Sequence, residues 1–161
     1  MKHYKAPWSK SLVVTTSLAT FSCLGITLYF VAYFHGWLRW EGFLPLAIIL
    51  VSALFTIRGY TVTPNAVLVH RLFWTTRLPL DGLESAQVEP EAMRGSIRTF
   101  GNGGLFSFTG RFRNESLGAY RALVTDPNGT VVLRFPKSTV LISPAAPQEF
   151  VHDIAQTSHA K

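Results

Sequence analysis

Arginines near aromatic residues carry the clearest chemical signal in this sequence. Arg111 and Arg113 lie two residues apart in a segment of alternating character, and Arg71 and Arg77 flank Trp74. The guanidinium group offers paired N–H donors that suit phosphate or carboxylate. These residues are therefore candidate contacts for an anionic lipid or a protein partner. The alternative is that the arginines lie singly on solvated strand faces, paired with nearby glutamates.

A glycine-rich stretch, FGNGGLFSFTGRF at residues 100–112, invites interpretation as a phosphate-binding loop. A P-loop needs Lys-Ser or Lys-Thr directly after its last glycine, and neither follows here. The spacing of Gly101, Gly103 and Gly104 also differs from the dinucleotide-binding pattern. We interpret these glycines as a structural turn, with Gly110 allowing a close approach or a bulge in a strand. A ligand-binding loop is the alternative.

Residues suited to catalysis or metal binding are sparse. The five histidines are scattered, without His-x-x-His or Cys-x-x-Cys spacing. No serine has the setting of an activated nucleophile. We predict that the protein is not an enzyme and uses no cofactor or metal. An enzyme would need a polar pocket that holds His70, or another titratable group, beside a partner.

The elements that must position these residues begin with two apolar segments. Residues 11–34 contain no charged residue and no histidine, and they are long enough to cross a hydrocarbon core about 30 Å thick. Residues 38–57 are predicted to form a second helix and complete a transmembrane hairpin over residues 1–58. An interfacial or re-entrant segment is the alternative for this second helix. Basic residues flank the hairpin on its outer sides, which predicts a multi-pass cell-membrane protein with both termini in the cytoplasm.

Beyond the hairpin, alternating apolar residues are typical of short strands. In one of them, Phe106, Phe108 and Phe112 are predicted to share one face, with Arg111 and Arg113 on the other. An Asp-Pro-Asn-Gly turn at residues 126–129 joins two of these strands. Residues 144–156 change to helical spacing, with Phe150 and Ile154 on one stripe. We predict a mainly β domain with α structure at residues 59–157, an antiparallel barrel of about seven strands capped by a C-terminal amphipathic helix. Residues 158–161 are predicted to be a disordered tail.

Four stretches of this region resemble a known family. They are LVHRLFWTTRLPLDGLESAQVEP (68–90), GNGGLFSFTGRF (101–112), LGAYRALVTDPNGTVVLRF (117–135) and LISPAAPQEFV (141–151). They are similar to bacterial pleckstrin-homology-like domains, in a subgroup with N-terminal membrane helices. The resemblance covers residues 60–154 and implies a fold more than a function. In eukaryotic relatives a basic loop between the first two strands binds phosphoinositides, but the corresponding residues 63–65 contain no Lys or Arg.

These features predict an integral membrane protein that presents a cytoplasmic pleckstrin-homology-like domain as a non-catalytic interaction or scaffold module, as in a subunit of a membrane assembly. From Arg58 onward there are 11 Lys or Arg against 8 Asp or Glu, a surplus too small to indicate nucleic acid. Only Arg58 and Gly59 separate the second apolar segment from the first strand, so the domain needs no recruitment to the membrane. This favours a protein partner. Sensing of anionic lipid headgroups by the arginines named above is the alternative.

Overall fold

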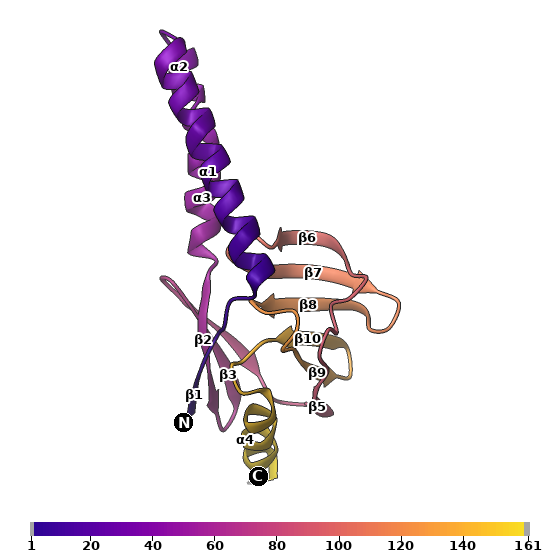
Figure 1. The fold of residues 1–161 in the computed structure, drawn as a ribbon. Coiled ribbons are helices and arrows are strands. Elements are labelled where there is room, and N and C mark those ends of the chain that lie inside the picture. Colours follow the sequence, from indigo (N-terminus) through magenta and orange to yellow (C-terminus); the bar gives the residue numbers. More distant parts are fainter. Residues whose placement is uncertain (1, 160–161) are drawn as a thin grey trace.

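A computed structural model describes residues 2–159, with the surroundings of side chains up to residue 156. Three helices within residues 10–54, which we call the helical arm, project from a β domain formed by the strands and the C-terminal helix (Figure 1). The helices are α1 (Lys10–Tyr33), α2 (Leu38–Glu41), α3 (Leu44–Leu54) and α4 (Pro147–His159). The strands are β1 (Lys2–Lys5), β2 (Ile57–Thr63), β3 (Ala66–Arg71), β4 (Thr75–Pro79), β5 (Ser85–Val88), β6 (Ile97–Gly103), β7 (Phe108–Asn114), β8 (Gly118–Val124), β9 (Val131–Phe135) and β10 (Ser138–Ile142).

The long helix α1 presents apolar side chains to its surroundings. It begins at Ser9, whose Oγ accepts a hydrogen bond from the Leu12 N–H at 3.1 Å. Leu18 and Phe21 are 64% and 72% exposed. Within the described residues, α1 is the one helix that is both long and apolar enough to cross a membrane. Such a surface is better matched to lipid than to water.

The prediction of a second membrane-spanning helix at residues 38–57 is wrong. This segment divides into α2 and α3, and β2 already begins at Ile57. Pro45, in the first turn of α3, has no N–H to donate to the carbonyl of Glu41, so one helix does not continue through it. With 11 residues, α3 is about 16 Å long, shorter than a hydrocarbon core of about 30 Å. The predicted transmembrane hairpin and multi-pass topology are therefore not supported.

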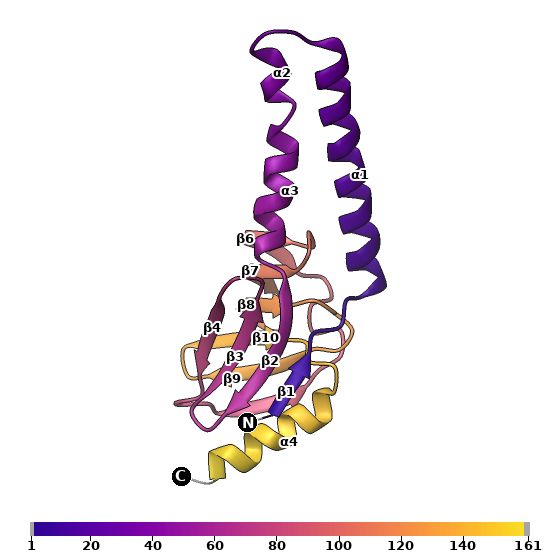
Figure 2. The same ribbon diagram turned by 90° about the vertical axis from the view of Figure 1, so that its left-hand side faces the viewer.

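The chain leaves the β domain through α1 and returns to the same sheet after α3 (Figure 2). β1 precedes α1, yet it pairs with β2, and Tyr4 lies opposite Tyr60 in that ladder. α3 packs along α1, and Thr27 Oγ1 donates a hydrogen bond to the Gly42 carbonyl at 2.7 Å. The segments before and after the helical arm therefore lie together at its base.

The described strands form two open sheets, so the prediction of a closed barrel is wrong. The first sheet has the order β1-β2-β3-β4, and the second has the order β5-β9-β10-β8-β7-β6. β4 and β6 each end a sheet without pairing with one another. The described chain has ten strands where the pattern predicts about seven, since β1 and β6 are not recognisable from their sequences. β8 and β10 pair in parallel, against the antiparallel prediction.

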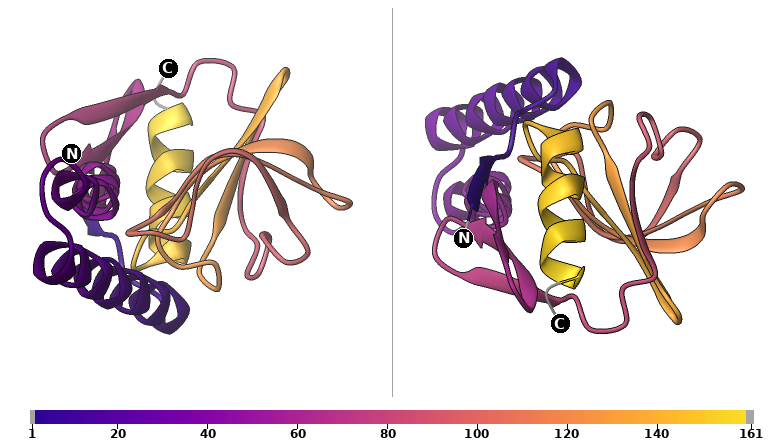
Figure 3. Two further views of the ribbon diagram at one scale, coloured as in Figure 1. Left: turned by 90° about the horizontal axis from the view of Figure 1, so that it is seen from above. Right: turned by 90° about the horizontal axis from the view of Figure 1, so that it is seen from below.

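The main core lies between the two sheets and α4. Figure 3 shows α4 between the sheets when the molecule is viewed along its long axis. Phe150 and Ile154 are essentially fully buried, as expected for the apolar stripe of this helix. Tyr60 is also fully buried, and its hydroxyl donates to the Leu123 carbonyl at 2.8 Å. Burial raises the pKa of Tyr60 to about 12.

α4 continues further than the sequence pattern predicts. It ends at His159, so the predicted tail at residues 158–161 begins inside this helix. Residues 160–161 lie outside the described part of the chain. A second apolar cluster, around Phe112, Tyr120 and Leu141, covers the outer face of the second sheet.

Candidate functional site

A groove of about 980 Å³ opens where β4 and the second sheet separate. The end of β4 and the residues after it form one side, and β7, β8 and the β9–β10 turn form the other. Its lining residues are Leu78, Pro79, Asp81, Gly82, Thr99, Arg111, Phe112, Ala119, Tyr120, Arg121, Phe135, Pro136, Lys137, Ser138, Thr139 and Val140. A barrel closed between β4 and the second sheet would have no such opening.

Two arginines face each other inside this groove. Arg111 on β7 lies directly opposite Arg121 on β8 in the antiparallel ladder. Leu123, two residues after Arg121, belongs to the core between the sheets. Alternate residues of a strand share a face, so both arginines lie on the inner face of the sheet, beyond the end of that core. Both are exposed, and within the described chain neither guanidinium pairs with a carboxylate.

The groove combines positive charge with an apolar surface. Lys137 on the β9–β10 turn adds a third basic group, and Asp81 is the acidic residue of the lining. Leu78 and Val140 are buried apolar residues that also contribute. This surface suits an anionic ligand with apolar groups beside its charge. Histidine and cysteine do not contribute to this lining, and no cluster suited to a metal ion occurs among the described residues.

The arginines predicted from the sequence do not gather at one place. Arg111 lies in the groove, and Arg113 follows on the same strand face, opposite Ala119. Arg77 pairs in register with Leu68, on the opposite face of β4 from the buried Leu78. The outward direction of Arg77 therefore separates it from the groove.

Arg71 and Trp74 lie instead at the base of the helical arm. Arg71 is buried, and its Nη1 donates to the Phe55 carbonyl at 2.7 Å. Its guanidinium lies 5.7 Å from the ring centre of Phe55 and 5.8 Å from that of Trp74. Burial, and then the positive charge of Arg121, lower the pKa of Arg71. Because Phe55 is the C-cap residue of α3, Arg71 stabilises the end of this helix.

The glycine-rich stretch joins the second sheet to the helical arm. The N–H of Phe106 donates to Thr16 Oγ1 of α1 at 3.0 Å, and Ser107 Oγ donates to the Phe55 carbonyl at 3.2 Å. Phe106 has a positive φ of 63° and lies in the turn before β7, with its ring 6.1 Å from that of Trp8. The alternating pattern predicts that Phe106 and Phe108 share one strand face. This prediction is wrong, because Phe106 lies in the turn and not in the strand.

Gly101 and Gly110 lie opposite each other where β6 and β7 approach closely. A Cβ atom on Gly110 would lie 2.1 Å from the Phe100 carbonyl oxygen, and one on Gly101 would lie 2.3 Å from the Thr109 oxygen. Their φ angles of 142° and 104° also favour glycine. Gly103 ends β6, and Gly104 follows it with a positive φ, at the turn that contacts α1.

His70 lies on the outer face of the first sheet, outside the groove. Its Nε2 is 2.8 Å from Thr61 Oγ1, and its ring is 5.6 Å from that of His3. Burial, and then the charge of His3, lower the pKa of His70. These contacts join β1, β2 and β3, and we assign His70 a structural role.

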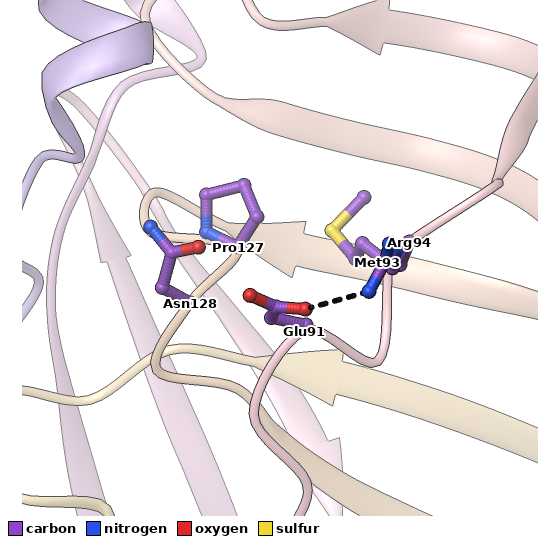
Figure 4. Close-up of a pocket in the computed structure, with 5 residues that line it drawn as sticks. All are labelled: Glu91, Met93, Arg94, Pro127 and Asn128. Carbon is purple, nitrogen blue, oxygen red and sulfur yellow. Dashed lines mark ion pairs between the residues drawn. The ribbon is translucent and has the colours of Figure 1, made fainter.

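A smaller hollow of about 410 Å³ lies beside the Asp126–Gly129 turn (Figure 4). Met93, Pro127 and Asn128 line it together with Glu91 and Arg94. The Glu91 and Arg94 side chains pair with each other at 3.6 Å and are largely exposed. Since this pair balances its own charge, the hollow offers less to a charged ligand than the groove does.

Lys137 is a groove residue that the sequence interpretation misses, and Arg121 is placed by the sequence only in the hairpin around residues 126–129, not opposite Arg111. Arg121 was detectable in principle, because Arg111 and Arg121 are equally distant from Ser116 in the turn between two strands. A hairpin centred there places them opposite each other. Lys137 gives no comparable signal, since its position depends on how the β9–β10 turn meets the end of β4.

Comparison with known proteins identifies most of the β domain. Residues 58–158 match a protein family described as bacterial PH domain. This range begins after α3 and includes all the residues that line the groove. No curated protein and no solved structure matches the chain.

Proposed function

Because the chain belongs to the bacterial PH domain family, we propose that it is a non-catalytic interaction module held at a membrane. The groove between β4 and the second sheet binds an anionic segment of a protein partner. α1 enters the bilayer and keeps the domain at its surface. The partner is then another protein of the same membrane or one that works beside it.

The observation that carries this proposal is the facing pair Arg111 and Arg121. Like charges placed directly opposite on neighbouring strands are unfavourable for folding. A carboxylate placed between the two guanidiniums would remove this repulsion and accept charge-assisted hydrogen bonds from both. Leu78 and Val140 offer apolar contacts beside the charge, which suits a peptide segment better than a free inorganic anion.

The anchoring part of the proposal rests on α1 and on the connection at its base. Exposed apolar side chains such as Leu18 and Phe21 favour lipid around this helix. The β1–β2 pairing holds the chain on both sides of the helical arm to the β domain. Because β1 pairs with β2, the chain before α1 and the chain after α3 lie on the same side of the membrane. We place this side, with the β domain and both termini, in the cytoplasm of a bacterial cell, because Lys2 and Lys5 precede α1 and Lys10 is its first residue.

Anionic lipid is the second candidate ligand, and the charge distribution favours it. No Asp or Glu occurs among residues 96–114, which include Arg98, Arg111 and Arg113. Each basic residue near an anionic leaflet contributes about 1 kcal/mol to membrane attraction. Arg121, however, lies on β8, two strands from β6 at the end of the sheet nearest the helices, a separation of about 10 Å. This position favours a protein ligand for the groove itself.

The full chain in nanodiscs of neutral lipid tests the proposal. The probe is a fluorescein-labelled peptide of alternating glutamate and valine, and fluorescence anisotropy measures its binding across a salt series. We expect binding that Arg121→Glu weakens by about tenfold or more, since carboxylate contacts are replaced by repulsion. Arg77→Glu has the same change of charge on the outer face and should leave the affinity nearly unchanged.

Equal losses with Arg121→Glu and Arg77→Glu would show that the peptide responds to net charge, and the groove would be rejected. The lipid candidate is tested in the same preparation by adding anionic lipid to the nanodiscs. If anionic lipid displaces the peptide from the wild-type chain, a lipid headgroup occupies the groove. If the peptide affinity is unaffected, lipid headgroups do not compete for the groove, and the lipid candidate is rejected.

A further inference from the structure

Outside the helical arm, large apolar side chains are also exposed at two places on the β domain. Leu72, Phe73 and Trp74 form the β3–β4 turn, and Ile97 and Phe100 lie on β6. Phe73, Ile97 and Phe100 are 75%, 73% and 76% exposed. We name these five residues the apolar rim. Several large apolar residues exposed together usually mark a contact surface.

Both parts of the apolar rim are fixed to the base of the helical arm. Trp74 packs edge-on against Phe55 at the end of α3, with ring centres 5.3 Å apart. β6 continues into the turn whose Phe106 N–H bonds to Thr16 of α1. In Figures 1 and 2, β6 and the β3–β4 turn lie at the end of the β domain that faces α1 and α3. A bilayer that surrounds α1 would therefore meet the apolar rim first.

The charge around the apolar rim complements an anionic bilayer. Residues 56–80, which contain the β3–β4 turn, include no Asp or Glu, and neither do residues 96–114, which contain β6. Arg98 lies between Ile97 and Phe100, and Arg113 is opposite Ile97 in the ladder. The acidic residues of the β domain lie instead in other segments, at Asp81, Glu84, Glu89, Glu91, Glu115, Asp126, Glu149 and Asp153.

We propose that the apolar rim inserts into the headgroup region of an anionic bilayer and holds the β domain in one orientation. Phe73 and Phe100 enter the boundary between headgroups and acyl chains, while Trp74 takes the interfacial position that tryptophan favours. Arg98 and Arg113 lie near the lipid phosphates. This proposal rests on the proposed entry of α1 into the bilayer and adds a second contact with the same membrane.

A bilayer is the occupant that fits this surface, because the apolar rim continues the lipid-suited surface of α1. Its two parts belong to different sheets and meet only around the helical arm (Figure 1). With the apolar rim in the membrane, β6 lies along the bilayer surface, and the other strands of its sheet lie at increasing distances from the bilayer. The groove on β7, β8 and β10 then opens beside the membrane and not into it. Partners that run along the surface have access to it.

Fluorescence with depth-dependent quenching tests this orientation in the full chain. Cys23, the single cysteine, is replaced by serine. An environment-sensitive fluorophore is then attached to one new cysteine at a time, at Phe73, Phe100, Leu18 or Gln148. Leu18 reports on α1, and the exposed Gln148 on α4 is the control at the far end of the domain. The chains are reconstituted into vesicles of neutral and anionic lipid that contain brominated acyl chains.

We expect blue-shifted emission and loss of intensity at Phe73, Phe100 and Leu18 in anionic vesicles, with no change at Gln148. Quenching at Leu18 combined with water-like emission at both Phe73 and Phe100 would overturn the proposal and leave the anchoring by α1 intact. Water-like emission at Leu18 would overturn both. A Phe73→Tyr, Phe100→Tyr chain labelled at Ile97 should keep the quenching, which separates insertion from damage caused by removing an aromatic ring.

Discussion

Arg111 and Arg121 lie directly opposite each other on β7 and β8, on the inner face of an open groove and without a carboxylate partner in the described chain. Folding brings these two positive charges together. A neutral polar side chain at either position would fit the strand equally well and would avoid the repulsion. Sites that bind ligands often keep such unfavourable arrangements, because the ligand relieves them. The pair therefore links stability and binding in opposite directions.

Arg121→Gln should make the free protein more stable while it weakens binding. Removing one of two facing like charges raises the free energy of unfolding by roughly 0.2–1 kcal/mol. Chemical denaturation of the full chain in detergent measures this change, with Arg77→Gln as the control of similar size and exposure. A loss of stability with Arg121→Gln alone would contradict the repulsion between Arg111 and Arg121.

Gly110→Ala should strongly destabilise the second sheet. The new Cβ would lie 2.1 Å from the Phe100 carbonyl oxygen at a φ of 142°, and backbone strain of this kind costs about 1–3 kcal/mol or more. Thermal unfolding of the full chain in detergent measures the loss. Gly129→Ala is the matched control, since its nearest contact is Asp126 Oδ2 at an ordinary 3.8 Å. Similar unfolding temperatures for the two variants would contradict the close approach of β6 and β7.

Tyr60→Phe should destabilise the junction between the two sheets. The Tyr60 hydroxyl donates to the Leu123 carbonyl at 2.8 Å and accepts from the Ser143 N–H at 3.3 Å. Its removal leaves buried polar groups without a partner, at a cost of about 1–3 kcal/mol. Denaturant unfolding checks this, with Tyr33→Phe on the exposed surface of α1 as the control. An equal, negligible effect of both changes would show that the buried hydroxyl adds nothing to stability.

The His3–His70 contact should make stability depend on pH on the acidic side. The pKa of His70 is lowered in the folded protein, first by burial and then by the charge of His3. The unfolded chain therefore binds the proton more readily. The His70 contribution is complete above its unfolded pKa of about 6.5 and is lost as the pH falls through the lower folded value.

Unfolding midpoints measured from pH 7.5 to pH 4.5 test this pH dependence. His70→Gln retains a hydrogen-bond partner for Thr61 and should reduce the loss of stability that the wild-type chain shows below pH 6.5. His152→Gln, on the exposed face of α4, is the control that should not. If His70→Gln and the wild-type chain lose stability in parallel, the titration of His70 does not contribute.

Local patterns in the sequence predict much of the β domain. The alternation in β7 correctly separates Phe108 and Phe112 from Arg111 and Arg113, and the stripe of α4 correctly identifies Phe150 and Ile154 as buried. The resemblance to bacterial PH-like domains is confirmed by the family match over residues 58–158. These features depend on residues close together in the chain or on stretches long enough to compare.

Features that depend on distant segments are not predictable in this way. β1 contains two lysines in four residues and becomes a strand only because β2, more than fifty residues later, offers its edge. Phe106 leaves the strand pattern because the turn that contains it contacts α1. The opening between β4 and the second sheet, and with it the groove, is set by how two sheets meet.

The short helix α3 was foreseeable from Pro45, which interrupts the second apolar segment.

Site-specific photocrosslinking in cells that naturally contain the protein shows directly whether a protein partner binds in the groove. A benzophenone amino acid replaces Ser138 in the groove or, as the control, Arg77 on the outer face, and membrane fractions are analysed after irradiation. We predict a protein adduct from position 138 that disappears when Arg111→Glu and Arg121→Glu are added, and no such adduct from position 77. An adduct from position 138 that persists with both charges reversed, or one that forms equally at position 77, would contradict binding in the groove.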